Sequence, residues 1–128
     1  MSKATILLVD DELEIRRIYS EGLEKGNYQI IDFETAEDAL RTFNKDPDQF
    51  DLALVDYNLP GMDGITLTKK MHIQRPDLPV ILISGYVNNP QKKLQFSVDV
   101  DIIITKPVDI DQLNSVVHRV LEPESSQE

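Results

Sequence analysis

The chain has 128 residues, which is the size of one ordinary domain and too short for two. Hydrophobic residues make up 41% of it, enough for a buried core, and the absence of cysteine excludes disulfides and thiolate metal sites. The net charge of −10, from 23 acidic and 13 basic residues, argues against a surface that wraps DNA or binds an anionic membrane.

Five short apolar runs recur along the chain and predict strands that are buried on both faces. The first run, TILLV, ends at Asp10, so it is too short for a signal peptide, and no segment is long enough to span a membrane. We therefore expect a cytoplasmic location. The predicted strands cover Thr5–Val9, Tyr28–Phe33, Asp51–Val55, Pro79–Ile83 and Asp101–Ile104.

The first two stretches between these runs carry apolar residues at the spacing of one helix face. In the first, the predicted buried residues are Ile15, Ile18, Tyr19, Gly22 and Leu23. In the second, they are Ala36, Ala39, Leu40 and Phe43, and Thr35 with Asp38 predicts an N-terminal cap.

Three further helices are predicted in the second half of the chain. One covers Ile65–Gln74 and is closed off by Pro76, and a weaker one covers Asn89–Ser97. The last begins at Asp109, with Gln112 as a capping partner, and ends near Pro123. Its predicted apolar side carries Ile110, Leu113, Val117, Val120 and Leu121.

Five strands that alternate with five helices predict an α/β fold, a (βα)₅ chain with a doubly wound, five-stranded parallel sheet. Right-handed crossovers favour the flavodoxin-like strand order 2-1-3-4-5. We expect one domain over residues 1–122, followed at 123–128 by a polar tail or the start of a linker.

Polar side chains stand where the predicted strands end, and in such sheets ligands bind beyond the carboxyl ends of the strands. The first strand is followed by Asp10 and Asp11, the third by Asp56, the fourth by Ser84 and the fifth by Lys106. Two like charges about 4 Å apart cost roughly 4 kcal/mol at an effective dielectric of about 20. A hard divalent cation relieves this repulsion, and oxygen ligands with retained waters suit Mg²⁺.

This set of residues predicts phosphoryl chemistry at Asp56. Its carboxylate would be the nucleophile that forms an acyl phosphate, with Lys106 as a point charge and the Ser84 hydroxyl as a donor to a phosphoryl oxygen. Taken singly, each residue has a simpler interpretation: Asp10 or Asp11 as a helix cap, Asp56 as a turn former, Lys106 as a solvated charge. The joint placement at strand ends favours the site. His72 and His118 lie on predicted helices and are interpreted as surface residues.

Four segments together resemble the receiver domain of two-component response regulators, over roughly residues 4 to 122. They are ILLVDDE at 6–12, DYNLPGMDG at 56–64, LISGY at 82–86 and TKP at 105–107.

The resemblance implies a role for each matching residue. Asp56 would receive a phosphoryl group from the phosphohistidine of a histidine kinase or phosphotransfer protein. Asp11, Asp56 and the backbone carbonyl of Asn58 would bind Mg²⁺, and Asp10 would hold it through water. Ser84 would contact the phosphoryl group and Lys106 would pair with it, next to a Lys106–Pro107 bond that is commonly cis in this family.

The resemblance also implies a tuning role for Asn58 and Tyr86 in the lifetime of the phosphoryl group, and a downstream output domain or partner protein. Two departures stand out. Ile103 occupies a position that usually holds Tyr or Phe, and Asp99-Val100 replaces a Gly-Ala pair. We expect the surface of the fourth helix, fifth strand and fifth helix to change without a rotating aromatic ring.

Two other functions remain open on the sequence. A phosphatase of the haloacid dehalogenase type would carry an Asp-x-Asp pair where this chain has DDEL, and a docking domain would keep only the fold. The starting Met-Ser-Lys slightly favours an N-terminal or free-standing receiver. The kinase, the stimulus, the output and a possible homodimer are not specified by the sequence.

Overall fold

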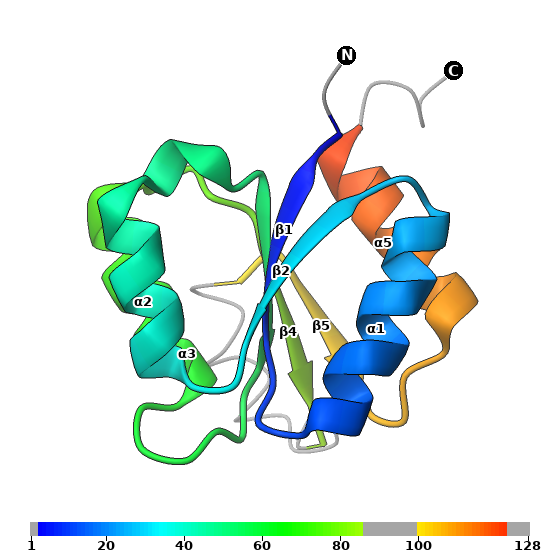
Figure 1. The fold of residues 1–128 in the computed structure, drawn as a ribbon, viewed down its shortest axis with the longest axis horizontal. Helices are drawn as coiled ribbons and strands as arrows, with labels where there is room; N and C mark the ends of the chain where they lie inside the picture. The colour runs from blue at the N-terminus through cyan, green and yellow to red at the C-terminus, as the bar shows by residue number, and fades with distance from the viewer. Residues whose placement is uncertain (1–2, 86–99, 123–128) are drawn as a thin grey trace.

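The computed structural model describes residues 3–85 and 100–122, and its strands form a single parallel sheet. The order is β2-β1-β3-β4-β5, which confirms the predicted flavodoxin-like order. All carboxyl ends therefore lie at one edge of the sheet, which is the lower end in Figure 1. The strands are β1 (Thr5–Val9), β2 (Gln29–Phe33), β3 (Leu52–Asp56), β4 (Val80–Ser84) and β5 (Ile102–Thr105).

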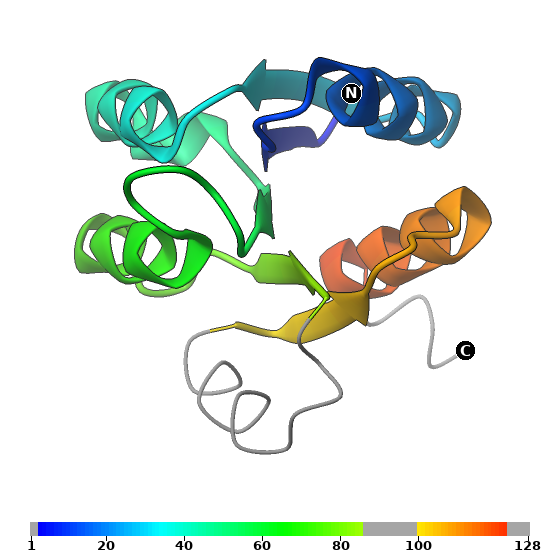
Figure 2. The same cartoon turned by 90° about the horizontal axis from the view of Figure 1, so that it is seen from below.

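Helices cover both faces of the sheet, as Figures 1 and 2 show. On one face lie α1 and α5, and on the other lie α2 and α3. The fourth predicted helix, Asn89–Ser97, lies outside the described residues. The described helices are α1 (Leu13–Lys25), α2 (Ala36–Lys45), the 3₁₀ helix η1 (Pro47–Gln49), α3 (Gly64–Gln74) and α5 (Ile110–Leu121).

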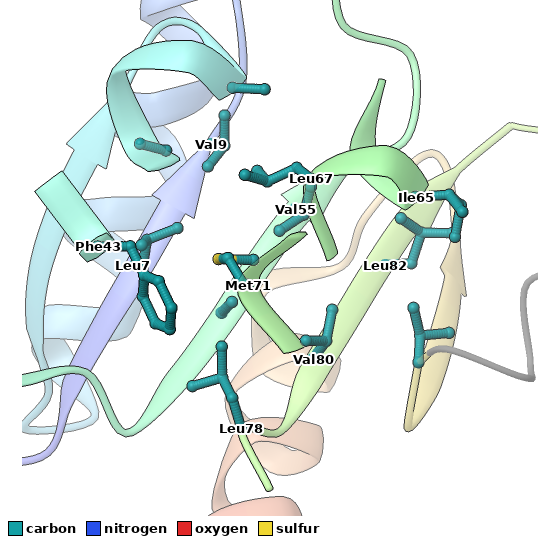
Figure 3. Packing of buried hydrophobic residues seen from close by; sticks show 14 of the residues in the cluster. Leu7, Val9, Phe43, Val55, Ile65, Leu67, Met71, Leu78, Val80 and Leu82 are labelled. Atoms are coloured by element: carbon teal, nitrogen blue, oxygen red, sulfur yellow. The ribbon is translucent and has the colours of Figure 1, made fainter. Parts of the chain in front are cut away.

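The core is divided in two by the sheet because successive strand side chains point to opposite faces. In β1, Leu7 and Val9 join the cluster under α2 and α3, which includes Phe43 and Met71 and is drawn in Figure 3. Ile6 and Leu8 of the same strand join the cluster under α1 and α5. Both faces of the central strands are thus buried, which explains the unbroken apolar runs in the sequence.

The strand boundaries differ from the prediction by one residue at several ends. The predicted runs begin too early at Asp51 and Asp101, because each of these carboxylates accepts a hydrogen bond at the neighbouring strand. Asp51 Oδ2 accepts from the Thr5 N–H at 2.7 Å, and Asp101 Oδ2 accepts from the Val80 N–H at 2.7 Å. At the other end, Asp56 and Ser84 belong to the strands, so both side chains are set by the sheet register.

The predicted helix caps are present. Thr35 Oγ1 accepts from the Asp38 N–H at 3.1 Å, and Asp109 Oδ1 accepts from the Gln112 N–H at 3.2 Å. The predicted inner face of α1 is wrong at Ile18, which is 50% exposed. Ile18 lies at the rim of a groove between α1 and α5, while Gly22, one turn further along, lies against Ile110.

The two ends of the described chain lie together at the amino end of the strands. Lys3 and Ala4, just before β1, line one pocket with Leu121 and Glu122, where α5 ends. This pocket is at the opposite edge of the sheet from the carboxyl ends of the strands. Within residues 3–85 and 100–122, none of the helices combines the length and apolar character that crossing a membrane requires.

Candidate functional site at the carboxyl end of the sheet

Asp56 is the last residue of β3 and is buried. Its carboxylate is held from two sides: Oδ1 accepts from the Asn58 N–H at 3.1 Å, and Oδ2 accepts from Lys106 Nζ at 3.0 Å. The first bond is the local turn contact expected of an aspartate before a Pro-Gly turn. The second joins residues 50 positions apart and brings a charge from the β5–α5 connection to the end of β3.

Asp10 directly follows β1 and is also buried. Its N–H donates to the Phe33 carbonyl at 3.2 Å, and its Oδ1 accepts from the Glu12 N–H at 2.8 Å. Among the described side chains, its Oδ2 is a buried oxygen without a hydrogen-bond partner. Burial, followed by the nearby charge of Asp56, raises the pKa of Asp10 to about 6.

Asp11 completes a group of three carboxylates. Asp10, Asp11 and Asp56 each offer an oxygen within 4.8 Å of the others, and only Asp11 is exposed. The arrangement fits a hard divalent cation such as Mg²⁺ for two reasons. The donors are all oxygens, and the orphaned Oδ2 of Asp10 is a buried acceptor that a cation or its bound water would satisfy.

Lys106 lies opposite these acids, and the Lys106–Pro107 bond is cis, as expected. Its N–H donates to the Ser84 carbonyl at 3.2 Å, which ties the chain after β5 to the end of β4. Burial alone would lower the pKa of the Lys106 ammonium, but the hydrogen bond and charge of Asp56 raise it above its ordinary value. Lys106 is therefore charged at neutral pH.

Ser84 is the last residue of β4, is buried, and is in register with Thr105 of β5. β4 is the neighbour of β3, so the serine stands on the strand next to Asp56. Tyr86, which was predicted to tune the lifetime of a phosphoryl group, lies outside the described residues.

The loop between β3 and α3 carries Asn58, whose backbone carbonyl is the remaining predicted metal ligand. Gly61 in this loop has a φ of +74°, which favours glycine. The Glu37 carboxylate of α2 accepts from the Met62 N–H at 3.3 Å. Gly64 begins α3, and a Cβ there would stand 2.5 Å from the Asp56 carbonyl oxygen. Only glycine allows α3 to start this close to the end of β3.

Ile103 and the two histidines, His72 and His118, are absent from the group of acids and Lys106. Ile103 of β5 is partly buried and packs against the cluster under α2 and α3. His118 pairs with Glu122 at 2.7 Å on the outside of α5. His72 was predicted to be a surface residue, but it is half-buried, and its Nε2 lies 3.0 Å from the Leu78 carbonyl. It therefore braces the turn after α3.

Two residues near the acids were missed in the sequence. Tyr19 of α1 is buried, and burial together with the charges of Asp10 and Asp56 raises its pKa to about 12. Arg16 reaches back from α1 to the Asp10 carbonyl at 2.7 Å. Its position beside Ile15 and Tyr19, at the border of the helix face that packs inward, was the available signal.

An apolar groove opens beside Lys106, between α1 and the segment before α5. Its lining residues are Glu12, Ile15, Ile18, Tyr19, Lys106, Pro107 and Val108. Ile18 is half-exposed at the groove, and Leu13 on the same helix is 51% exposed.

Comparisons with known proteins agree with this geometry. A family model described as the response regulator receiver domain matches residues 6–118. The chain is 34% identical to the regulatory protein VanR of Enterococcus faecium over 102 residues, which are 80% of this chain and 43% of that protein. It is 31% identical to sporulation initiation phosphotransferase F of Bacillus subtilis (strain 168) over 128 residues, covering 98% of this chain and 100% of that protein.

Among solved structures, a CheY-like response regulator receiver domain protein from Methanospirillum hungatei JF-1 superposes with a TM-score of 0.86 at 29% identity. That match covers 99% of this chain and 100% of the other. The chain spans less than half of VanR, and about a quarter of the transcriptional regulators DctD of Rhizobium meliloti and NtrC of Proteus hauseri. The likeness to these longer proteins is confined to one part of each.

Proposed function

Because the chain belongs to the response regulator receiver domain family, a family of two-component signalling proteins, we propose that it is a phosphoacceptor whose Asp56 takes a phosphoryl group from phosphohistidine. The observation that carries the proposal is the position of the Asp56 carboxylate. It lies between the acids that follow β1 and the Lys106 ammonium, 3.0 Å away. No single residue of this set is diagnostic, but together they surround one nucleophilic oxygen pair.

In the proposed reaction, a carboxylate oxygen of Asp56 attacks the phosphorus of a partner's phosphohistidine. A phosphorus–oxygen bond forms, the phosphorus–nitrogen bond breaks, and the imidazole nitrogen keeps the electron pair. Lys106 exchanges part of its interaction with Asp56 for the incoming phosphoryl oxygens, and the Ser84 hydroxyl donates to another of them. Water later attacks the phosphorus, releases inorganic phosphate and restores the carboxylate. The only catalysis is this transfer and self-hydrolysis.

Asp10, Asp11, Asp56 and the Asn58 carbonyl would hold Mg²⁺, the cofactor we propose for this site. When bound, Mg²⁺ neutralises phosphoryl oxygens and removes the repulsion among the three carboxylates. Support comes from the buried, unpartnered Oδ2 of Asp10 and from the oxygen-only donor set.

The partner would be a histidine kinase or a phosphotransfer protein, and the apolar groove beside Lys106 offers it a contact surface next to Asp56. One relative that matches over its full length is a sporulation initiation phosphotransferase, which supports phosphoryl transfer. Phosphorylation would switch a surface read by an output domain or partner protein. We assign the receiver domain to residues 1–122 and place the protein in the cytoplasm.

The test is to incubate the purified protein with acetyl phosphate and Mg²⁺ and to measure its mass. We expect a gain of one phosphoryl group, lost when EDTA is added beforehand, and no gain for Asp56→Asn. The substitution Asp51→Asn serves as a control because Asp51 is an exposed aspartate at the opposite edge of the sheet.

Each of the other outcomes would indicate a different function for this protein. Absence of labelling at millimolar Mg²⁺ would indicate a docking domain that keeps only the fold. Continuous release of phosphate from unrelated phosphate esters would indicate a phosphatase. Either result would overturn the proposed phosphoacceptor.

A further inference from the structure

Arg16 makes two contacts that join three elements at the edge of the site. It lies in α1, its Nη1 donates to the Asp10 carbonyl at 2.7 Å, and its Nε donates to Asp32 Oδ2 of β2 at 2.9 Å. The Arg16 side chain is only 11% exposed, whereas that of Asp32 is 44% exposed. The guanidinium is thus buried against the chain just after β1, and its rigid fork fits two acceptors at once.

These contacts complete the fixation of Asp10. Its N–H is held by the Phe33 carbonyl of β2, its own carbonyl by Arg16, and its Oδ1 by the Glu12 N–H. Three of its four polar positions are therefore occupied, and only Oδ2 remains available to face Asp11 and Asp56. The Asp10 carbonyl also belongs to the peptide that leads into Asp11, so the same bond restrains how Asp11 is presented.

We propose that Arg16 is a positioning residue for Mg²⁺: it fixes the Asp10–Asp11 peptide so that both carboxylates meet the cation. This inference rests on the proposed function, because it requires Mg²⁺ at the three acids. Arg16 contacts Asp10 at its backbone carbonyl, so in this role it acts through the backbone and not as a ligand. Mutation of a group that orients a metal ligand by hydrogen bonding to it typically lowers metal affinity by about 10- to 100-fold.

An effect of the Arg16 charge alone would change Mg²⁺ affinity in the opposite direction. The direction of the change therefore separates positioning from general electrostatics. A cation near a metal site repels Mg²⁺, and removing Arg16 also leaves the Asp32 carboxylate uncompensated. If charge were the whole role, Arg16→Ala would bind Mg²⁺ more tightly than the wild type. If Arg16 positions the acids, the same variant binds Mg²⁺ more weakly in spite of its more negative surroundings.

The experiment is a calorimetric titration of the full chain with Mg²⁺ at constant ionic strength, for the wild type, Arg16→Ala, Arg16→Lys and Arg17→Ala. Arg17 is the matched control because it is the next residue, carries the same charge and is exposed. We expect Kd to rise about tenfold or more for Arg16→Ala and several-fold for Arg16→Lys. Arg17→Ala should stay within about twofold of the wild type.

A second readout excludes a merely structural role. Labelling by acetyl phosphate should be slower in Arg16→Ala at low Mg²⁺ and should recover to the wild-type rate when Mg²⁺ is saturating. Circular dichroism checks that the variants are folded at the titration temperature. Should Arg16→Ala not fold, Arg16→Lys decides in the same way, and wild-type affinity in that variant overturns the inference.

The outcomes also separate this inference from the function on which it rests. A wild-type protein that binds no Mg²⁺ would defeat both. A wild type that binds Mg²⁺, with Arg16→Ala binding as tightly as Arg17→Ala or more tightly, would defeat the positioning role alone and leave the phosphoacceptor in place.

Discussion

At the scale of single residues, the site holds a carboxylate whose charge is unfavourable where it is buried. Asp10 is buried, one of its oxygens has no hydrogen-bond partner among the described residues, and its pKa is raised to about 6. The carboxylate form of Asp10 is thus less favourable in the folded chain than in the unfolded chain, where the pKa of this group has its ordinary value of 3.8. A buried residue whose charged form costs stability is typical of a functional site.

This cost predicts how Asp10→Asn changes stability with pH. Between about pH 4 and about pH 6 the folded state holds a proton that the unfolded state has released, so this contribution to stability is lost as pH rises through about 6. In EDTA we expect the variant to be more stable than the wild type above about pH 7, with the difference shrinking towards about pH 4. Urea unfolding at several pH values measures it. A difference in unfolding free energy between Asp10→Asn and the wild type that does not change with pH would contradict the raised pKa of Asp10.

At the scale of elements, the site depends on how closely α3 approaches the end of β3. The Gly64 N–H donates to the Tyr57 carbonyl at 3.0 Å, and the Asp63 side chain caps the helix through the Thr66 N–H at 2.8 Å. Because α3 starts directly against the backbone of Asp56, both ends of the loop that carries Asn58 lie close together and the loop is restrained. The position of the helix and the geometry of the acids are therefore coupled.

Gly64→Ala should break this coupling. Its Cβ would stand 2.5 Å from the Asp56 carbonyl oxygen and 2.9 Å from Val55 Cγ1, so backbone must move. We expect a loss of about 2 kcal/mol or more in the free energy of unfolding, together with weaker Mg²⁺ binding. Gly85→Ala is the control, because a Cβ there meets no atom of the described residues within 4 Å. Chemical denaturation and Mg²⁺ titration give both quantities, and equal effects at the two glycines would refute the coupling.

At the scale of the whole molecule, a net charge of −10 is combined with three acids at one end of the sheet. Self-repulsion of this kind destabilises the compact state, and a cation bound only by the folded protein opposes it. The same fold also fixes where the acids can be, since they follow strands whose carboxyl ends share one edge.

Mg²⁺ should therefore stabilise the whole fold beyond what salt does. At a concentration of about ten times its Kd, a ligand of the folded state adds roughly 1.4 kcal/mol, or a rise in Tm of about 5 °C for a chain of this size. Thermal unfolding in Mg²⁺ and in NaCl of equal ionic strength measures the difference. Asp11→Asn should lose the specific rise, and an equal rise in the two salts would show that only screening is involved.

Much of the fold was predictable from the sequence, because burial on both faces leaves unbroken apolar runs and because connection rules restrict the strand order. The errors occurred where a side chain had a second role. Asp51 and Asp101 look like strand residues but cap neighbouring strands, and Ile18 has helical spacing but lies at the rim of a groove. His72 was misjudged because its acceptor, the Leu78 carbonyl, depends on the turn after α3.

The candidate site likewise contains residues that could be predicted from the sequence and one that could not. Asp10, Asp11, Asp56 and Lys106 could be brought together from the sequence because each stands at or just after the carboxyl end of a strand, and all strands end at one edge. The role of Arg16 could not be predicted. This residue lies on a helix and contacts the carbonyl of Asp10, just after β1, and the carboxylate of Asp32 in β2. Such contacts depend on how far α1 lies from the sheet, which no spacing in the sequence specifies.

The meeting of the two described chain ends at the far edge of the sheet has a practical consequence. Lys3 and Glu122 line the same pocket, while the acids lie beyond the opposite ends of the strands. Fluorescent proteins attached directly before Lys3 and after Glu122 would start side by side, on the side away from Asp56. Energy transfer between them would then report on the separation of β1 and α5 in living cells, while the carboxyl end of the sheet stays accessible to the partner proposed above.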